Sequence, residues 1–175
     1  MFLYYLLNFL GLACFIASFL VKGKKMGLII FLCFCGNALV GLAYLKDGRG
    51  MTAAASSFLG AAQALINYFF QSRSKKIPWW IIIMHVASFV GLNLWVGKLS
   101  WGTMLAIVGC LCGVMALIQN SGKRYRFWML CNNTTWGAYD ILLHTYGGLI
   151  IHIVLMLFTL TGVFIHDIKR SKRVN

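Results

Sequence analysis

An acidic residue, Asp140, interrupts the otherwise apolar stretch Cys131 to His152, which reads CNNTTWGAYDILLHTYGGLIIH. Helical spacing places Asn133, Gly137, Asp140 and His144 on one face of this stretch. An ionisable side chain inside a membrane segment costs about 3 kcal/mol on insertion scales, so it usually serves a solute, an ion or a proton. We therefore expect Asp140 to be functional, and a purely structural role in helix packing is the alternative.

Two further side chains of this stretch are candidates for the same site. At 1.5 Å per residue, Asp140 and His152 are each expected about 10 Å from the outer membrane surface, on successive spans, so the sequence predicts that they meet. A lone histidine at such a position is more often a packing residue, but beside an acid it becomes the natural partner. Trp136 lies next to the polar face, where its ring lines a solute chamber or packs in the core.

Matching polar stripes occur on two other predicted helices. Asn37, Gly41 and Tyr44 share one face, so that Tyr44 takes the place that Asp140 holds later in the chain. The next helix carries a longer stripe of Ser56, Gly60, Gln63, Asn67 and Gln71. Such side chains bind solutes, or they join helices through hydrogen bonds worth about 1 kcal/mol each. The sequence leaves both interpretations open for these amides and for Asn133.

The sequence shows no catalytic or metal-binding constellation. It holds three acidic residues in all, too few for an easily built paired-carboxylate hydrolase. The six cysteines lie in apolar runs, and pairs two apart, such as Cys33 and Cys35, point away from each other on a helix. We expect packing cysteines, no metal, no cofactor and no enzymatic activity. An intramembrane enzyme that uses Asp140 and His152 is the most distant alternative.

Composition indicates that membrane helices position these residues. Hydrophobic residues make up 61% and charged residues 11% of the 175 residues, and the mean hydropathy is +0.81. Almost every window of about 20 residues is apolar enough to cross a bilayer. The predicted fold class is an all-α, multi-pass membrane protein with seven transmembrane helices. The predicted spans are residues 2–21, 26–45, 51–71, 78–97, 100–119, 127–144 and 147–166.

The distribution of charge predicts the orientation in the membrane. A net charge of +13 in a soluble protein would suggest nucleic acid as a partner, but here the basic residues cluster between apolar runs. Alternate loops are rich in Lys and Arg, including Arg126, whereas the loops between them hold only Lys46, Arg49 and Lys98. The positive-inside rule then places the N-terminus outside and the C-terminus in the cytoplasm. The expected partners are membrane lipids and not nucleic acid.

A short internal repeat divides the chain. The spacing C-x-N-x-x-x-G occurs at residues 35–41 and again at 131–137. It predicts a first three-helix bundle at 1–72, a linker helix at 73–98, and a second three-helix bundle with a basic cytoplasmic tail at 99–175. Because the linker adds one crossing, both bundles enter the membrane in the same orientation, which gives a parallel 3+1+3 repeat.

This arrangement resembles the SWEET and PnuC class of small-solute transporters. The segment from Arg124 through Trp136 and the glycine pair at 147–148 to His152, with the basic tail, is similar to the YgjV family of bacterial inner-membrane proteins, which is grouped with that class. The resemblance covers essentially the whole chain and implies a multi-pass protein of the bacterial cytoplasmic membrane. The Pro-Gln hinge motif of SWEET-type transporters is absent. Asp140 and His152 stand where the YgjV pattern more often has an amide and an acid.

The sequence thus predicts a secondary or facilitated transporter for a small polar or cationic solute, with two three-helix bundles alternating around a central site. The predicted solute-binding residues are Asn37, Tyr44, Gln63, Asn67, Asn133, Trp136, Asp140 and His152. The competing hypothesis is a membrane scaffold, immunity or regulatory protein whose polar stripes only hold helices together. A homo-oligomer is compatible with the sequence but not required, since both halves lie in one chain.

Overall fold

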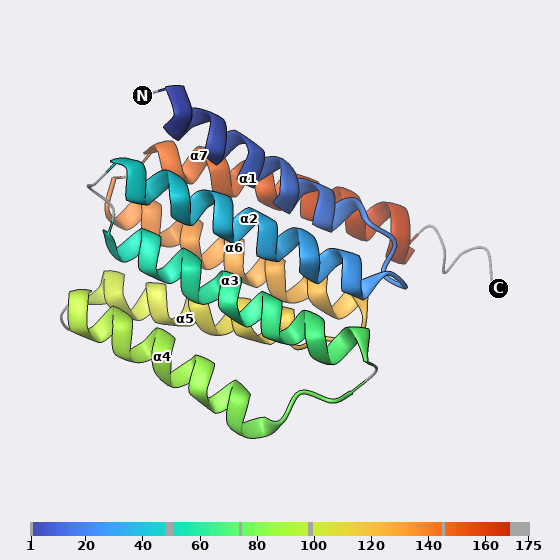
Figure 1. The fold of residues 1–175 in the computed structure, drawn as a ribbon. Coiled ribbons are helices and arrows are strands. Elements are labelled where there is room, and N and C mark those ends of the chain that lie inside the picture. The colour runs from blue at the N-terminus through green and yellow to red at the C-terminus, as the bar shows by residue number, and fades with distance from the viewer. Residues whose placement is uncertain (1, 48–50, 74, 98–99, 145, 169–175) are drawn as a thin grey trace.

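The computed structural model describes residues 2–47, 51–73, 75–97, 100–144 and 146–168. Within these ranges the chain forms seven α-helices, a short π-helical turn and no strand (Figure 1). The elements are α1 Phe2–Leu20, α2 Met26–Asp47, α3 Met51–Ser72, α4 Trp79–Gly97, α5 Trp101–Leu117, α6 Gly122–Leu142, α7 Tyr146–Val163 and η1 Phe164–Ile168. The predicted all-α fold with seven helices is confirmed.

The sixth helix differs most from its predicted bounds. The side chain of Ser121 caps the N-terminus of α6 by accepting a hydrogen bond from the backbone N–H of Arg124 at 3.3 Å. Therefore α6 begins at Gly122, within the basic loop, and not at residue 127, where the apolar run starts; it ends at Leu142. Asp140 lies in the last turn of α6, two residues and about 3 Å from its end.

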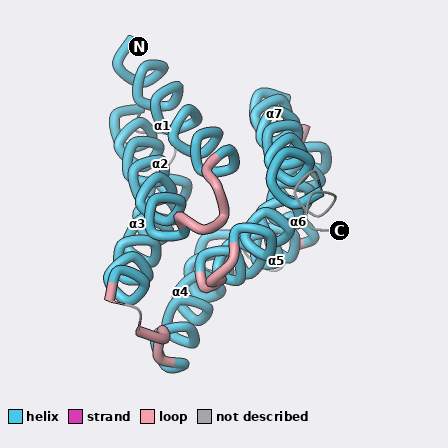
Figure 2. Tube along the Cα trace, turned by 90° about the vertical axis from the view of Figure 1, so that its right-hand side faces the viewer, coloured by secondary structure: helices cyan, strands magenta, loops and turns pink. Residues whose placement is uncertain are grey.

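The helices pack in chain order. Each α-helix packs against the next one, α7 also packs against α1, and α3 also touches α5. In Figure 2, which is turned by 90° from Figure 1, α1, α2 and α3 form one group and α5, α6 and α7 form another. Helix α4 lies between α3 and α5. Two groups of three helices therefore face each other.

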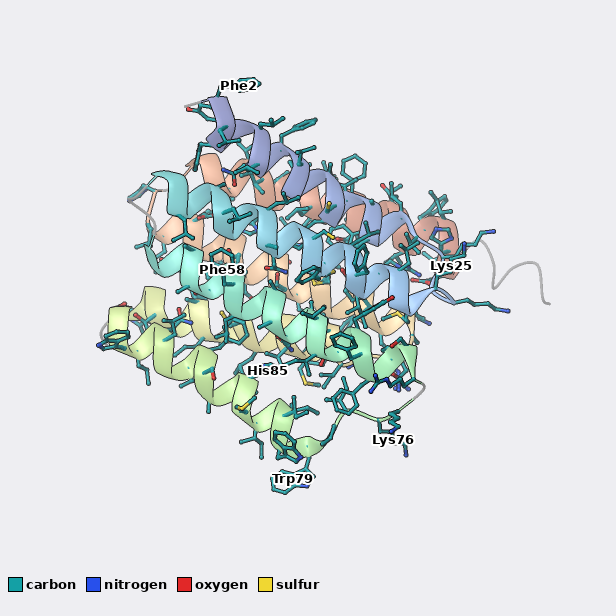
Figure 3. The ribbon with its side chains drawn as sticks, viewed as in Figure 1. Phe2, Lys25, Phe58, Lys76, Trp79 and His85 are labelled. Atoms are coloured by element: carbon teal, nitrogen blue, oxygen red, sulfur yellow. The ribbon has the colours of Figure 1, made fainter. Side chains whose placement is uncertain are left out.

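One end of the bundle carries most of the basic side chains. Lys25 and Lys76 extend from this end in Figure 3, although they belong to different loops. We call it the basic end, and its exposed or half-buried cations are Lys22, Lys24, Lys25, Arg73, Lys75, Lys76, Lys123 and Arg124. Arg126, predicted to be a loop residue, is instead buried inside α6 with 1% of its surface exposed. Asp140 lies at the opposite end of the same helix.

Three described segments are long and apolar enough to cross a membrane: Phe2–Leu20, Met26–Ala43 and Leu149–Ile168. Shorter apolar segments occur at Trp79–Trp95 and Trp101–Leu117. Helices α3 and α6 do not reach these limits, because they carry the polar stripes and, in α6, basic residues in the first turns. Seven membrane crossings therefore remain a prediction.

The surface and the interior have the polarity of a membrane protein. Large apolar side chains are exposed on the outer faces of the helices, among them Phe9, Trp95 and Leu157. Polar side chains are buried instead; the described ones are Ser18, Gln63, Asn67, His85, Asn93, Thr103, Arg126, Asn133, Asp140 and Thr159. In lipid the apolar faces need no cover, whereas polar groups must find partners inside the bundle.

The core is densest near the basic end, where Tyr125 of α6 is fully buried. Its hydroxyl lies 2.9 Å from the Ser18 hydroxyl of α1 and 2.9 Å from the Cys33 sulfur of α2. One phenol thus joins three helices, and apolar side chains of α2, α3, α5 and α7 close around it. Cys33 is reduced and buried here, as expected for a packing cysteine.

Helix contacts of the first half recur in the second. A Cβ on Gly11 of α1 would lie 2.7 Å from Val40 of α2, and one on Gly109 of α5 would lie 2.8 Å from Trp136 of α6. Val40 and Trp136 each directly precede the glycine of the C-x-N-x-x-x-G motif. In both halves the same motif position therefore packs a side chain onto a glycine of the preceding helix.

A second pair of contacts exchanges large and small residues. A Cβ on Gly36 of α2 would lie 3.0 Å from the ring of Phe15 in α1, and one on Gly113 of α5 would lie 3.3 Å from the amide of Asn132 in α6. Gly36 and Asn132 each directly precede the motif asparagine. The large residue belongs to the first helix in one half and to the second helix in the other, while the contact position is the same.

Candidate functional site

The predicted meeting of Asp140 and His152 is present in the structure. His152 Nε2 lies 3.6 Å from Asp140 Oδ2, a distance suited to an ion pair but too long for a direct hydrogen bond. The Asp140 side chain is 9% exposed and the His152 side chain 21% exposed. His152 lies six residues beyond the start of α7, about 9 Å along the helix.

The position of Asp140 in the last turn of α6 is electrostatically demanding. The helix dipole places partial negative charge at this end, which disfavours an acid by about 0.3–1 kcal/mol. An imidazole from the next helix offers a compensating partner. The pair is therefore a polar site near the end of the bundle opposite the basic end, and its depth in the membrane stays a prediction.

Trp136 lies directly against this pair. Its ring is nearly parallel to the His152 ring, with centroids 6.3 Å apart and planes at 12°, and it meets Tyr139 edge-on with centroids 5.2 Å apart. One face of the indole is thus turned toward His152. We refer to Trp136, Asp140 and His152 as the acid–histidine cluster. The predicted stacking of Trp136 on a solute stays a prediction; in the structure the indole ring lies parallel to the His152 ring.

Gly109 of α5 allows the indole to reach this position. An added Cβ would lie 2.8 Å from Trp136 Nε1, and the carbonyl of the same glycine accepts a 2.7 Å hydrogen bond from Asn132 Nδ2. The backbone of α5 and the side chains of α6 therefore pack without an intervening side chain. A larger residue at this position must displace the indole.

Replacing Gly109 by alanine is expected to lower the free energy of unfolding by about 1–3 kcal/mol through overpacking against Trp136. Gly27→Ala is the matched control, because its added Cβ would make only an ordinary contact, 3.8 Å from Tyr68. Unfolding in graded detergent measures both. Gly109→Ala/Trp136→Phe should recover part of the loss; an equally destabilised double variant would mean that the indole is not the obstacle.

The amides lie on α2, α3 and α6. Asn37 donates its Nδ2 hydrogen to the Cys33 carbonyl at 2.9 Å, and its Oδ1 lies against Gly60, where an added Cβ would be 2.9 Å away. Gly60 is one helical turn from Gln63 on α3. Gln63 and Asn133 are each 1% exposed, and Gln63 Nε2 and Asn133 Nδ2 find no hydrogen-bond acceptor among the described residues. Such buried donors are costly unless something binds them.

Asn67 and Gln71 have a different setting. Asn67 Nδ2 donates to the Leu117 carbonyl at 3.1 Å, and Gln71 Nε2 donates to the Gln119 carbonyl at 3.3 Å and to Asn120 Oδ1 at 2.7 Å. The last carbonyls of a helix have no partner within it. These two amides of α3 therefore cap the C-terminal end of α5, which gives Asn67 a structural contact near the basic end.

The structure thus gathers some predicted residues and separates others. Trp136, Asp140 and His152 are in contact, and Asn67 serves the α3–α5 interface. The side chain of Tyr44 lies outside the described part of the structure. No group of three or more His, Cys, Asp or Glu side chains among the described residues is arranged to hold a metal ion.

Sequence reasoning did not anticipate the pairing of Arg126 with Asp167. Arg126 Nη2 lies 2.7 Å from Asp167 Oδ1, and Arg126 Nε lies 3.1 Å from Asp167 Oδ2, which is a bidentate ion pair. The sequence did contain a signal that Arg126 is buried. Helical spacing places it on the same face as Met129 and Asn133, and Tyr125 begins this buried face.

Apolar outward faces around buried polar groups define a helical membrane protein. The family can also be assigned. Residues 2–170 match the family model Imp-YgjV, described as a bacterial inner membrane protein, so the chain belongs to this family of the bacterial inner membrane. No curated protein and no solved structure matches the chain.

Proposed function

We propose that this inner-membrane protein is a secondary or facilitated transporter for a small polar or cationic solute. The observation that carries the proposal is the acid–histidine cluster: an acid 9% exposed, placed 3.6 Å from a histidine, between helices whose exposed residues near the pair, such as Ile141 and Ile151, are apolar. An acid in such a setting is rarely retained for packing alone, since a neutral side chain would be cheaper to bury.

The cluster favours a cation as the preferred solute. A carboxylate attracts positive charge, and the neighbouring indole and phenol rings of Trp136 and Tyr139 present electron-rich faces that favour cations. The unpaired donors of Gln63 and Asn133 supply hydrogen bonds to oxygen or nitrogen acceptors of the same solute. Asn37 lies beside Gly60, one turn from Gln63, and completes the proposed amide set. Tyr44 is included among the proposed solute-binding residues because of its position in the sequence repeat alone.

The proposed mechanism is alternating access between two parallel bundles, 1–72 and 99–175, joined by a linker helix at 73–98. The recurring contacts of Gly11 with Val40 and of Gly109 with Trp136 support such a 3+1+3 repeat, and with it the grouping with the SWEET and PnuC class. No catalytic, metal or cofactor role is part of the proposal, and a homo-oligomer is not needed.

The proposed orientation has the N-terminus outside, the C-terminus in the cytoplasm and seven crossings. Support comes from the basic end, because Lys25 and Lys76, from different loops, lie at the same end of the bundle (Figure 3). Short loops rich in Lys and Arg are retained on the cytoplasmic side of bacterial inner membranes. The acid–histidine cluster then lies toward the outer surface.

The competing function is a membrane scaffold, immunity or regulatory protein. The observation in its favour is that several polar side chains act as ordinary helix connectors: Asn67 and Gln71 cap α5, and Asn132 of α6 bonds the Gly109 carbonyl. Hydrogen bonds of this type are worth about 1 kcal/mol in membranes and need no solute. The acid–histidine cluster is the part that this alternative does not explain.

The test is Asp140→Asn in the full chain reconstituted in vesicles. The probes are choline as a small cation, glucose as a neutral polyol and lactate as an anion. We expect choline uptake to be the largest and to fall about ten- to a hundredfold in the variant, since a charge-assisted contact contributes about 1.5–3 kcal/mol. Thr134→Ala is the control, because Thr134 is exposed on the same helix and its hydroxyl bonds only the Leu130 carbonyl of α6 and the Met156 sulfur.

The outcomes separate the two functions. Loss of uptake with normal accumulation and unfolding supports transport. Uptake of glucose in preference to choline would replace the cation by a neutral solute. A variant that only folds less well, with no probe taken up by either protein, would favour the scaffold.

A further inference from the structure

The basic end contains a buried ion pair that holds an arginine of the second half against the end of α1. Arg126 of α6 pairs with Asp167 of η1, and both side chains are largely hidden, at 1% and 8% exposure. The remaining nitrogen of the guanidinium, Nη1, donates to the carbonyls of Phe19 and Val21 at 3.5 and 3.3 Å. One arginine therefore connects the end of α1 with α6 and η1.

His166 makes a second connection of the same kind. Its Nε2 lies 2.8 Å from the Leu20 carbonyl, and this contact is exposed at the surface of the bundle. His166 and Asp167 are adjacent in sequence, and the π-helical turn η1 lets both reach the α1–α6 side. Short π-helical turns frequently occur at functional sites. Three successive carbonyls at the end of α1, from Phe19 to Val21, are thus bonded from the other half.

The corresponding interface between α3 and α5 has no charge. There Asn67 and Gln71 of the first half bond the carbonyls of Leu117 and Gln119 at the end of α5. Neutral amides of one half therefore bond carbonyls at the end of the first helix of the other half. At the end of α1 the same task falls to Arg126 of α6 and His166 of η1, so it does not in itself require the Arg126–Asp167 ion pair.

Backbones approach closely around the charged interface. A Cβ on Gly162 of α7 would overlap the Phe19 carbonyl oxygen and lie 3.0 Å from Arg126 Cδ. A Cβ on Gly23, in the loop after α1, would lie 3.0 Å from the Cα of Gly122. Small residues let α1 and its loop settle onto α6 and α7, so that the interface closes over Tyr125.

We infer that the Arg126–Asp167 pair, together with His166, is a conformational latch: the bundle opens at its basic end by parting α1 from α6 and η1, and the latch holds that interface shut. The ion pair itself stays within α6 and η1, where it fixes the guanidinium so that Nη1 donates to the Phe19 and Val21 carbonyls. Parting α1 from α6 leaves these buried donors and carbonyls without their partners, and that cost resists opening. Opening exposes the hydrogen-bonded group of Tyr125, Ser18 and Cys33 directly beneath. The inference concerns how the bundle opens and does not depend on the proposed transport.

Cys33 is a built-in reporter of this opening. It is 2% exposed, its sulfur bonds Tyr125, and Tyr125 adjoins Arg126 in the chain. Cys110 is buried to a similar degree, at 7% exposure, but it belongs to a separate apolar cluster of α3, α4, α5 and α6. Local opening of the latch therefore reaches Cys33 and not Cys110, whereas general loosening reaches both.

The experiment measures alkylation by N-ethylmaleimide in full-length chains that retain only Cys33 or only Cys110. The double variant Arg126→Gln/Asp167→Asn removes both charges, and Arg124→Gln, an exposed arginine on the same helix, is the control. We expect the double variant to raise the Cys33 rate about tenfold or more, with Cys110 and the control unchanged. An unchanged Cys33 rate in a folded variant, or an equal rise at both cysteines, would overturn the latch.

A second variant keeps the inference testable if the double variant does not accumulate. Leu20→Cys/His166→Cys, joined by a short bifunctional thiol reagent, ties α1 to η1 permanently. We expect cross-linked protein to show Cys33 alkylation about tenfold slower than the same protein before cross-linking. Equal rates would show that Cys33 is reached by another route, and the latch would be wrong.

Discussion

Replacing Arg126 alone by glutamine is expected to lower the free energy of unfolding by about 3–5 kcal/mol, because it leaves one partner of a buried ion pair uncompensated. The Asp167 side chain is 8% exposed and holds two contacts to the guanidinium. The carbonyls of Phe19 and Val21 lose a donor at the same time. Unfolding of the purified protein in graded denaturing detergent measures the loss.

A double-mutant cycle isolates the pair. Asp167→Asn alone should also be strongly destabilising, while Arg126→Gln/Asp167→Asn should lose less than the two single losses together, since no charge is then left without its partner. Arg124→Gln should change stability by less than about 0.5 kcal/mol, as for most exposed positions. Additive losses would mean that the two side chains do not interact as the structure describes.

The number and approximate bounds of the helices could be predicted from the sequence, because each apolar run is close to the length that a membrane helix needs. The largest error was at α6, where hydropathy suggested a start at residue 127 and the helix begins at Gly122. The reason is local: Ser121 caps the helix, and capping by a hydroxyl is independent of the apolar pattern that follows.

The contact between Asp140 and His152 was predictable because it depends on two neighbouring helices joined by a short connection. The partners of Arg126 were not, since they come from the two ends of the chain, at Phe19 and Asp167. Hydropathy counts Arg126 as a loop cation; its helical spacing with Met129 and Asn133 indicates a buried face, but its partners follow only from tertiary packing. Asn67 shows the converse case: it belongs to a polar stripe and was predicted to bind a solute, but in the structure its side chain caps the end of α5.

The two halves differ most at the positions where the second half carries ionisable side chains. Val40 and Trp136 occupy equivalent positions and make equivalent contacts with a glycine, but only the indole stacks on a histidine that faces an acid. The neutral α3–α5 cap and the latch with its charged Arg126–Asp167 pair differ in the same sense. Both ionic sites therefore involve α6, one at each end.

Gly162→Ala tests the closure of the latch from its apolar side. Alanine normally favours a helix over glycine by about 1 kcal/mol, but at this position the new methyl group would overlap the Phe19 carbonyl oxygen and press on Arg126 Cδ. Because the obstacle is backbone, α7 must shift away from α1, and we expect a net loss of about 1–3 kcal/mol in the free energy of unfolding.

The control is Gly91→Ala on α4, where an added Cβ would meet nothing within 4 Å. It should leave stability unchanged or slightly raised. A second measurement ties the effect to the latch: in Gly162→Ala the alkylation of Cys33 should rise relative to that of Cys110, because the shift of α7 lengthens the contacts of Asp167 and His166 with α6 and α1. If Gly162→Ala is as stable as Gly91→Ala, the close approach of α7 to α1 is not maintained in the membrane.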